Sequence, residues 1–171
     1  LGAACKAVPS IGAVYQKFPQ AATLNGTYAY ARMDWVCRTS KNQETHVALG
    51  AGQDKAQDAN RPGGNRARSD MHIRHEQIVQ LPVLPYVGNL TGQLTAWLRH
   101  AQSKDKLAYS DLLGDLKSNT KRTDVGLGYW VPVSKLWSAG LNIETTSQRS
   151  NNTLFNLKNS AIYAGIRWAQ D

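Results

Sequence analysis

The chain has 171 residues, of which 42% are hydrophobic and 19% charged, and 20 Lys and Arg against 12 Asp and Glu give a formal net charge of +8. This length suits one domain, no run of about 18 apolar residues is present to form a membrane-spanning helix, and the five Trp and seven Tyr argue against disorder. The positive charge favours an anionic partner such as lipid phosphate, an acidic glycan or nucleic acid, without choosing among them.

Alternation of apolar and polar residues with a period of two is the dominant pattern of the chain. Between residues 27 and 38, Met33 and Trp35 hold odd positions, whereas Arg32 and Asp34 hold even positions. A strand with two different environments produces this pattern. The expected strands, in chain order, cover residues 7–18, 27–38, 45–51, 70–76, 89–99, 124–133, 137–148 and 162–168. The first has the weakest pattern, because Pro9 interrupts it.

No long segment shows the 3.6-residue period of a helix, so the sequence predicts an all-β protein whose antiparallel neighbours are joined by hairpins. The connections alternate between long and short along the chain. We therefore expect the loops around Gly63, Asp111 and Asn152 to share one end of the sheet, with Lys41, Pro85 and Lys135 at the other. Such sorting is typical of outer-membrane barrels, which have short periplasmic turns and long outer loops.

Two interpretations of the apolar face compete. In a soluble barrel or sandwich this face is the core, whereas in a membrane barrel it meets lipid and the charged face fills the lumen. Strands of about ten residues suit a tilted membrane crossing, and ion pairs between charges of both signs suit a lumen. Aromatic residues near strand ends, which suit a membrane-interface girdle, are Trp35, Tyr129, Trp137 and Trp168.

The prediction is an antiparallel up-and-down β-barrel of about eight strands that crosses the bacterial outer membrane. Residues 1–171 form this single domain or the C-terminal part of a larger barrel. The charged residues expected in the lumen, paired with one another, are Arg32, Asp34, Arg38, Asp70, Arg74, Glu76, Arg99, Asp124, Glu144 and Arg167. Gly126 and Gly128 are expected to leave room beside large lumen side chains.

No residue pattern indicates catalysis or a bound cofactor. The four His residues lack zinc-ligand spacing and no nucleophile stands out, so we expect neither an enzyme nor a metal site. A hairpin centred in residues 19–25 would place Cys5 and Cys37 opposite each other on one face, where they could form a disulfide. The alternative is two free thiols facing lipid or core.

Three loop segments carry a resemblance to a known family. They are Arg61-Pro62-Gly63-Gly64-Asn65-Arg66, Tyr109-Ser110-Asp111-Leu112-Leu113 and Ser150-Asn151-Asn152-Thr153-Leu154-Phe155. Each precedes a strand, and the last strand ends in Gly165-Ile166-Arg167-Trp168. This arrangement resembles the C-terminal β-barrel of tetratricopeptide-containing outer-membrane proteins of Gram-negative bacteria, of the surface lipoprotein assembly modulator type. Family barrels usually have more than eight strands and follow a helical repeat domain, which implies a shorter relative or a fragment of a larger barrel.

The resemblance implies a pore or anchor for export or surface assembly of a lipoprotein or polysaccharide. Membrane lipid is the expected partner, and no nucleic acid is expected. Loop cations that could meet lipopolysaccharide phosphates are Lys55, Arg61, Arg66, Arg68, Lys104, Lys106, Lys117, Lys121 and Arg122. The alternative is a soluble basic β-barrel that binds an anionic glycan or nucleic acid.

Overall fold

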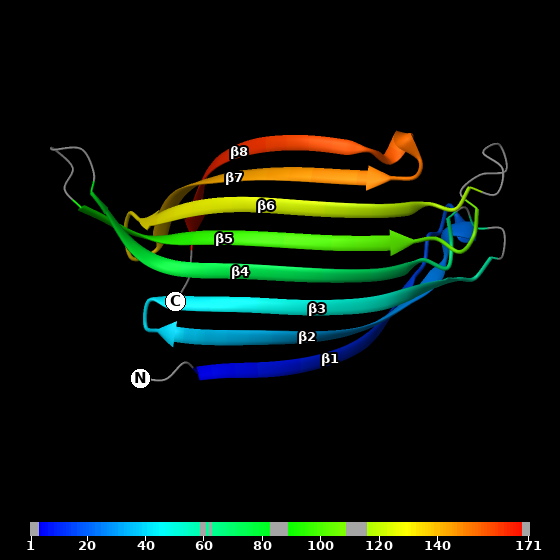
Figure 1. Cartoon of the computed structure of the whole chain (residues 1–171), viewed down its shortest axis with the longest axis horizontal. Helices are drawn as coiled ribbons and strands as arrows, with labels where there is room; N and C mark the ends of the chain where they lie inside the picture. Colours follow the sequence, from blue (N-terminus) through cyan, green and yellow to red (C-terminus); the bar gives the residue numbers. More distant parts are fainter. Residues whose placement is uncertain (1–3, 59–60, 62, 83–88, 109–115, 169–171) are drawn as a thin grey trace.

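Eight strands in chain order form one antiparallel sheet in the computed structural model, which describes residues 4–58, 61, 63–82, 89–108 and 116–168 (Figure 1). They are β1 (Ala4–Gln16), β2 (Gly26–Ser40), β3 (Gln43–Ala56), β4 (Ala67–Pro82), β5 (Asn89–Lys104), β6 (Asn119–Pro132), β7 (Trp137–Ser150) and β8 (Leu157–Trp168). Two short 3₁₀ turns, η1 (Ala22–Leu24) and η3 (Thr153–Phe155), precede β2 and β8. The predicted all-β, up-and-down topology is confirmed.

Within the described ranges, no helix is long and apolar enough to cross a membrane.

The strands are longer than most of the sequence patterns indicated. The largest difference is in β4, which was predicted over 70–76 and extends from Ala67 to Pro82. The reason is that backbone pairing with an equally long β5 continues after the apolar alternation fades. Five cations predicted in loops therefore lie within strands: Lys55, Arg68, Lys104, Lys121 and Arg122.

The pairing register separates the sheet into an apolar and a polar face. Side chains of strands two apart, about 10 Å from each other in a flat sheet, meet on the polar face. Arg32 on β2 lies 3.8 Å from the Asp70 carboxylate on β4, and the Arg167 guanidinium on β8 lies 3.6 Å from the ring centre of Trp130 on β6. The polar face is therefore the concave one, and the apolar face is convex.

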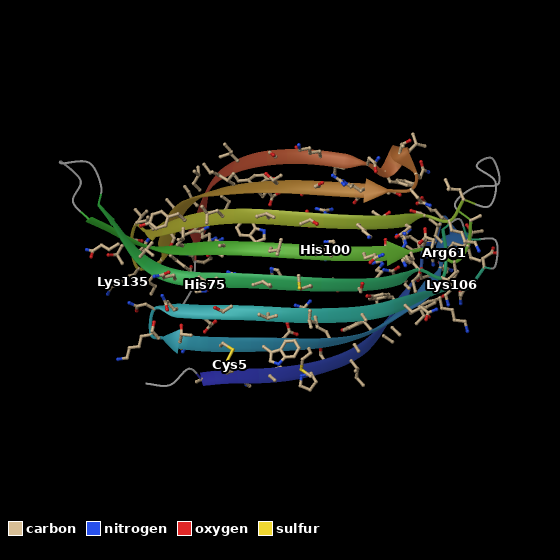
Figure 2. The ribbon with its side chains drawn as sticks, in the orientation of Figure 1. Cys5, Arg61, His75, His100, Lys106 and Lys135 are labelled. Carbon is tan, nitrogen blue, oxygen red and sulfur yellow. A yellow bond between two sulfur atoms is a disulfide. The ribbon has the colours of Figure 1, made fainter. Side chains whose placement is uncertain are left out.

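The long connections share one end of the sheet, as predicted. Figure 2 shows Arg61 and Lys106 at that end and Lys135 at the opposite end. Hydrogen bonds link the long connections to one another, including Gly63 N to Ala108 O at 2.9 Å. Asp111 and Pro85, which were part of the same prediction, lie outside the described residues.

The sheet is open, whereas the sequence led us to expect a closed barrel of about eight strands. In the described part of the chain β1 pairs only with β2 and β8 only with β7. Large side chains on the concave face give a physical reason. An eight-stranded barrel has an interior that its side chains just fill, and this face carries Trp97, Trp130 and seven arginines on β2, β4, β5, β6 and β8. These side chains need a wider interior than a closed barrel of eight strands provides.

A disulfide joins the edge strand β1 to its neighbour β2. Cys5 of β1 and Cys37 of β2 are direct partners in the register, with Cα atoms 4.1 Å apart, and their sulfur atoms are bonded. Pro9, which has no backbone N–H, lies on the same edge strand, where a missing donor is tolerated. The bond therefore fixes a strand that has a neighbour on one side only.

Mass spectrometry of unreduced protein treated with an alkylating reagent is expected to show no added alkyl group, and two after reduction. Because the bond joins residues 32 positions apart, changing both Cys5 and Cys37 to Ser is expected to lower the free energy of unfolding by about 3–4 kcal/mol in the chain-entropy model. Two alkyl groups on the unreduced protein would contradict the bond.

Candidate functional site on the concave polar face

The concave polar face gathers all ten charged residues that the sequence assigned to a lumen. The register places them on the same side of six strands, although they are spread over 136 positions between Arg32 and Arg167. The pairing among them is only partly as predicted. Three of the acidic residues find their arginine two positions away on the same strand, which puts both side chains on one face.

At the centre of this face, Arg32 connects two carboxylates. Its Nε donates to Asp34 at 3.0 Å, and its Nη1 lies 3.8 Å from Asp70. Arg74 pairs in the same way with Glu76, which also accepts a hydrogen bond of 2.8 Å from Gln93. These residues are half-buried, so each pair is screened by solvent and fixes side-chain direction more than it adds stability.

Asp124 pairs with a residue that the sequence analysis left out of the lumen. Arg122 Nε donates to Asp124 at 2.8 Å, and Thr146 Oγ1 donates to the same carboxylate at 2.7 Å. Arg122 had been assigned to a loop. Its even number, shared with Asp124, was the signal that places it on this face. Arg99 faces Asp124 across the β5–β6 ladder but has no ion pair among the described residues.

A further charged group lies at the short-turn end of the sheet. Arg38 donates to Glu44 at 2.7 Å, and His46 Nε2 lies 2.6 Å from the other oxygen of that carboxylate. The hydrogen bond from Arg38 is the largest cause that lowers the pKa of Glu44 below its usual range, followed by the hydrogen bond from His46. Glu44 therefore stays ionised in moderately acidic solution, and its contribution to stability is lost as the pH falls through this lowered pKa.

Two predicted lumen residues, Arg167 and Glu144, contact aromatic side chains and not other charged residues. Arg167 stacks on Trp130, whose indole N–H donates to Asn142 at 3.2 Å. Glu144 accepts a hydrogen bond of 3.0 Å from the Tyr163 hydroxyl. Among the described residues, Glu144 and Arg167 therefore make none of the expected ion pairs with other charged residues. Trp130 has even parity with Asp124, which would have placed it on this face from the sequence.

Aromatic rings on the concave polar face lie over glycines of neighbouring strands. A Cβ on Gly126 would collide with the Trp97 ring, one on Gly140 with Trp130, one on Gly12 with Tyr30 and one on Gly52 with Tyr28. The room predicted at Gly126 is thus filled by Trp97, and at Gly128 by Asn142. A ring that lies flat over a glycine takes less height above the sheet, which relieves crowding where the face is concave.

The first family-like loop motif, in residues 61–66, is held in place by ion pairs and hydrogen bonds. Arg61 pairs with Asp54, whose side chain is 4% exposed, and Arg66 donates to Asp105 at 3.1 Å. Gly63 and Asn65 have φ of 61° and 54°, a left-handed conformation that Gly and Asn tolerate best. Gly64 is buried, and its carbonyl accepts hydrogen bonds from the loop before β6. Pro62 lies outside the described residues.

The motif before β8 has a similar role. Asn151 Nδ2 donates to Lys117 O at 2.7 Å, and its Oδ1 accepts from Asn119 N at 2.8 Å, so this loop is attached to the start of β6. The Phe155 carbonyl accepts a hydrogen bond from Gln148, and Leu154 is 78% exposed. Tyr109, which belongs to the remaining family-like motif, lies outside the described residues.

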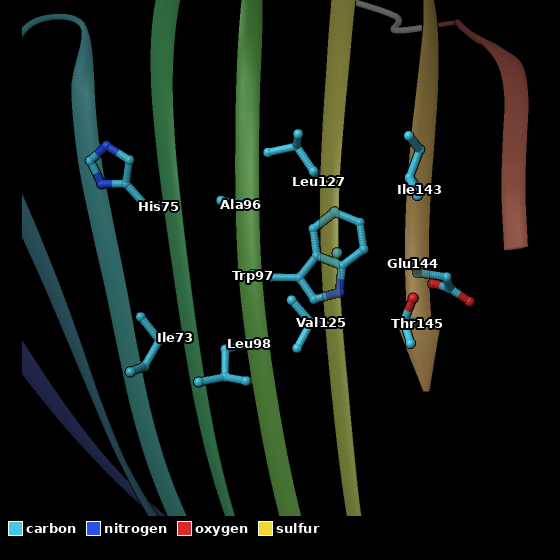
Figure 3. A pocket seen from close by; sticks show the side chains of 11 residues that line it. Ile73, His75, Ala96, Trp97, Leu98, Val125, Leu127, Ile143, Glu144 and Thr145 are labelled. Carbon is cyan, nitrogen blue, oxygen red and sulfur yellow. The ribbon is translucent and has the colours of Figure 1, made fainter. Parts of the chain in front are cut away.

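The convex apolar face has no protein layer over it in the described structure. Figure 3 shows a shallow hollow on β4 to β7 in which Ile73, Leu98, Leu127 and Ile143 stand side by side. Towards the short-turn end, Trp137 and Trp168 form a cross-strand pair with ring centres 6.4 Å apart.

Comparison of the chain with protein-family models, with curated proteins and with solved structures finds no match. In the ranges that the structure covers, no group of three or more His, Cys, Asp or Glu residues could hold a metal ion.

Replacing Gly126 by Ala is expected to lower the free energy of unfolding by about 1–3 kcal/mol, because the new methyl group collides with Trp97. Gly165→Ala is the matched control, since a Cβ there meets Trp130 at an ordinary contact distance of 3.5 Å. Adding Trp97→Ala should remove the extra cost of Gly126→Ala. Equal losses in the two glycine variants, measured by urea unfolding, would contradict the role of the ring.

Changing Asp54 to Asn is expected to cost on the order of 3 kcal/mol, because it leaves the mostly buried Arg61 without its carboxylate. Glu44→Gln removes an equivalent partner from Arg38, whose side chain is 67% exposed, and should cost much less. Unfolding midpoints of both variants provide the measurement. If Glu44→Gln lowered the stability as much as Asp54→Asn does, burial of the arginine would not explain the loss at Asp54.

Proposed function

We propose that this chain forms part of the wall of an outer-membrane β-barrel, in which the convex apolar face contacts lipid and the concave polar face lines the interior. The barrel serves as a pore or anchor for export or surface assembly of a lipoprotein or polysaccharide. The membrane location is supported by the two faces of the sheet, and the type of cargo by the resemblance of the loop motifs.

The observation that carries this proposal is the absence of a protein core on the apolar face. Among the described residues only two hydrophobic side chains are buried, Ala48 and Trp130, and both lie on the concave polar face. Ile11, Ile162 and Ile166 on the convex face are 86%, 69% and 73% exposed. Soluble proteins rarely leave a continuous apolar surface of this kind in water, whereas lipid covers it at no cost.

Aromatic residues on the convex face support a membrane boundary near the short-turn end. The four residues predicted to form a girdle, Trp35, Tyr129, Trp137 and Trp168, all lie in the half of their strands nearest that end. Their amphipathic rings suit the interface between acyl chains and headgroups. The short turns would then face the periplasm and the long loops the cell exterior.

The free edges of β1 and β8 favour a barrel of more than eight strands. Open edges do not occur in the hydrocarbon region of a membrane, because their N–H and C=O groups would lack partners. Further strands must therefore complete the wall. A wider interior would also accommodate the arginines and aromatic rings of the concave polar face, which together exceed what eight strands enclose.

Two substitutions test whether the convex face is covered by lipid or by water: Ile162→Arg and Leu154→Arg. Both side chains are more than two-thirds exposed, but Ile162 lies mid-strand on the convex face and Leu154 lies in a loop. An Arg on the lipid-facing side of a barrel lowers its stability by about 2–4 kcal/mol at the bilayer midplane. Outside the membrane the same change has an effect near zero. Ile162→Arg should therefore reduce the membrane-integrated fraction by tenfold or more, whereas Leu154→Arg should leave it unchanged.

The measurement is resistance of the expressed chain to alkaline carbonate extraction, followed by solubilisation in detergent. Wild type is expected to require detergent. A chain that is soluble without detergent, with both variants behaving as wild type, would overturn the membrane proposal and favour a soluble basic sheet that binds an anionic glycan or nucleic acid.

A further inference from the structure

A hollow of about 390 Å³ opens on the concave polar face, between its centre and the long loops. Its floor is Ala101 of β5, which lies directly between Asp70 of β4 and Arg122 of β6 in the register. The small side chain leaves space that its longer neighbours surround. Arg99 and Ser103, two positions before and after Ala101 on the same strand, complete the ring of neighbours.

The side chains that line this hollow carry more positive than negative charge. Four arginines line it, Arg66, Arg68, Arg99 and Arg122, against a single carboxylate, Asp70. Arg66 and Arg122 are compensated by Asp105 and Asp124 at the margins, and Asp70 itself lies close to Arg32.

Two of the four arginines make no ion pair in the described structure, although Arg99 faces Asp124 across the β5–β6 ladder. Arg68 and Arg99 lie on the neighbouring strands β4 and β5, and neither has a carboxylate within 4.0 Å among the residues that the structure describes. The Arg68 guanidinium lies 5.3 Å from the centre of the Tyr28 ring, a cation–π contact that fixes its position but does not neutralise its charge.

Uncharged polar groups line the other side of the hollow. Ser103 and Thr120 face each other across the β5–β6 ladder, and Gln148 is opposite Arg122 on β7. Gln148 uses its amide N–H on the Phe155 carbonyl. Its amide oxygen can accept a hydrogen bond, and the two hydroxyl groups can donate and accept. Such a set matches a ligand with several hydroxyl groups.

We propose that this hollow binds an anionic saccharide, whose phosphate or carboxylate groups contact Arg99 and Arg68, four positions apart in the β4–β5 register, and whose hydroxyl groups meet Ser103, Thr120 and Gln148. Guanidinium groups bind both oxyanions through paired hydrogen bonds. The volume exceeds what a bare phosphate ion fills, which is why a saccharide is favoured. The site depends only on the concave polar face, so it goes beyond the proposed membrane role and stands whether or not lipid covers the convex face.

The test is isothermal titration of the full-length chain, in detergent if it requires one, with three probes. They are an oligogalacturonate that carries carboxylates, a hexose monophosphate that carries a phosphate, and an uncharged maltose oligomer. At least one anionic probe should bind about tenfold more tightly than the maltose oligomer, because only the anion gains charge-assisted hydrogen bonds. The stronger of the two anionic probes identifies the charged group.

Substitutions then locate the site. Arg99→Gln and Arg68→Gln should each weaken the anionic probe about tenfold, as expected when a charge-assisted pair is lost. Arg149→Gln makes the same change in net charge on the opposite face, where Arg149 lies opposite Lys121 in the strand register, and should change binding less than twofold. Ala101→Gln fills the hollow without altering charge and should weaken binding by a similar factor to Arg99→Gln.

Equal binding of charged and uncharged probes would overturn the proposal, as would binding of none of them. An effect of Arg149→Gln as large as that of Arg99→Gln would also overturn it, because the attraction would then be a property of net charge. If Arg99→Gln does not fold, Arg99→Lys retains the charge and should still weaken binding by loss of the planar fork. Failure of binding leaves the carbonate extraction result unaffected, so the two proposals fail separately.

Discussion

Crowding on the inner side of a curved sheet is the constraint on which the rest of this structure depends. Most strands alternate polar-face residues, many of them charged or aromatic, with apolar ones, and curvature brings the side chains of the polar face closer together. Glycines beneath Trp97, Trp130, Tyr28 and Tyr30 let these large rings lie flat on the neighbouring strand. The sheet can therefore bend towards its polar side without a protein layer opposite, and the apolar residues spread over the outer surface.

Charge neutralisation on the concave polar face is mostly local. Arg32 with Asp34, Arg74 with Glu76, and Arg122 with Asp124 are all pairs two residues apart on one strand. Such pairs form as soon as a strand is extended, so they do not depend on how the sheet is completed. Among the described residues, three arginines of this face make no ion pair: Arg68, Arg99 and Arg167. Arg68 and Arg99 line the same hollow.

The sequence predicted the topology and the two faces well, because residue parity alone decides which side of a strand a side chain occupies. It also placed Cys5 opposite Cys37, since the register of the first hairpin follows from its turn, and left open whether the two form the disulfide that the structure shows. Strand ends were missed because ladder pairing extends several strands past the alternation. Because β6 begins at Asn119 and not at residue 124, Arg122 was assigned to a loop and left out of the site. Contacts between side chains two strands apart on the concave polar face, such as that of Arg167 with Trp130, depend on the curvature of the sheet. No local sequence pattern encodes that curvature.

The long loops form a rim in which each hairpin is tied to the next. Gln57 N donates to Asn25 O, Gly63 N to Ala108 O, and Asn151 N to Asn119 O, so the described parts of the connections at this end are linked in sequence. A force that spread the sheet at this end would have to break the Arg66–Asp105 ion pair and backbone hydrogen bonds between hairpins. At the outer sides of β1 and β8 the described structure has no such ties, so separation of the sheet from its surroundings would begin at those two edges.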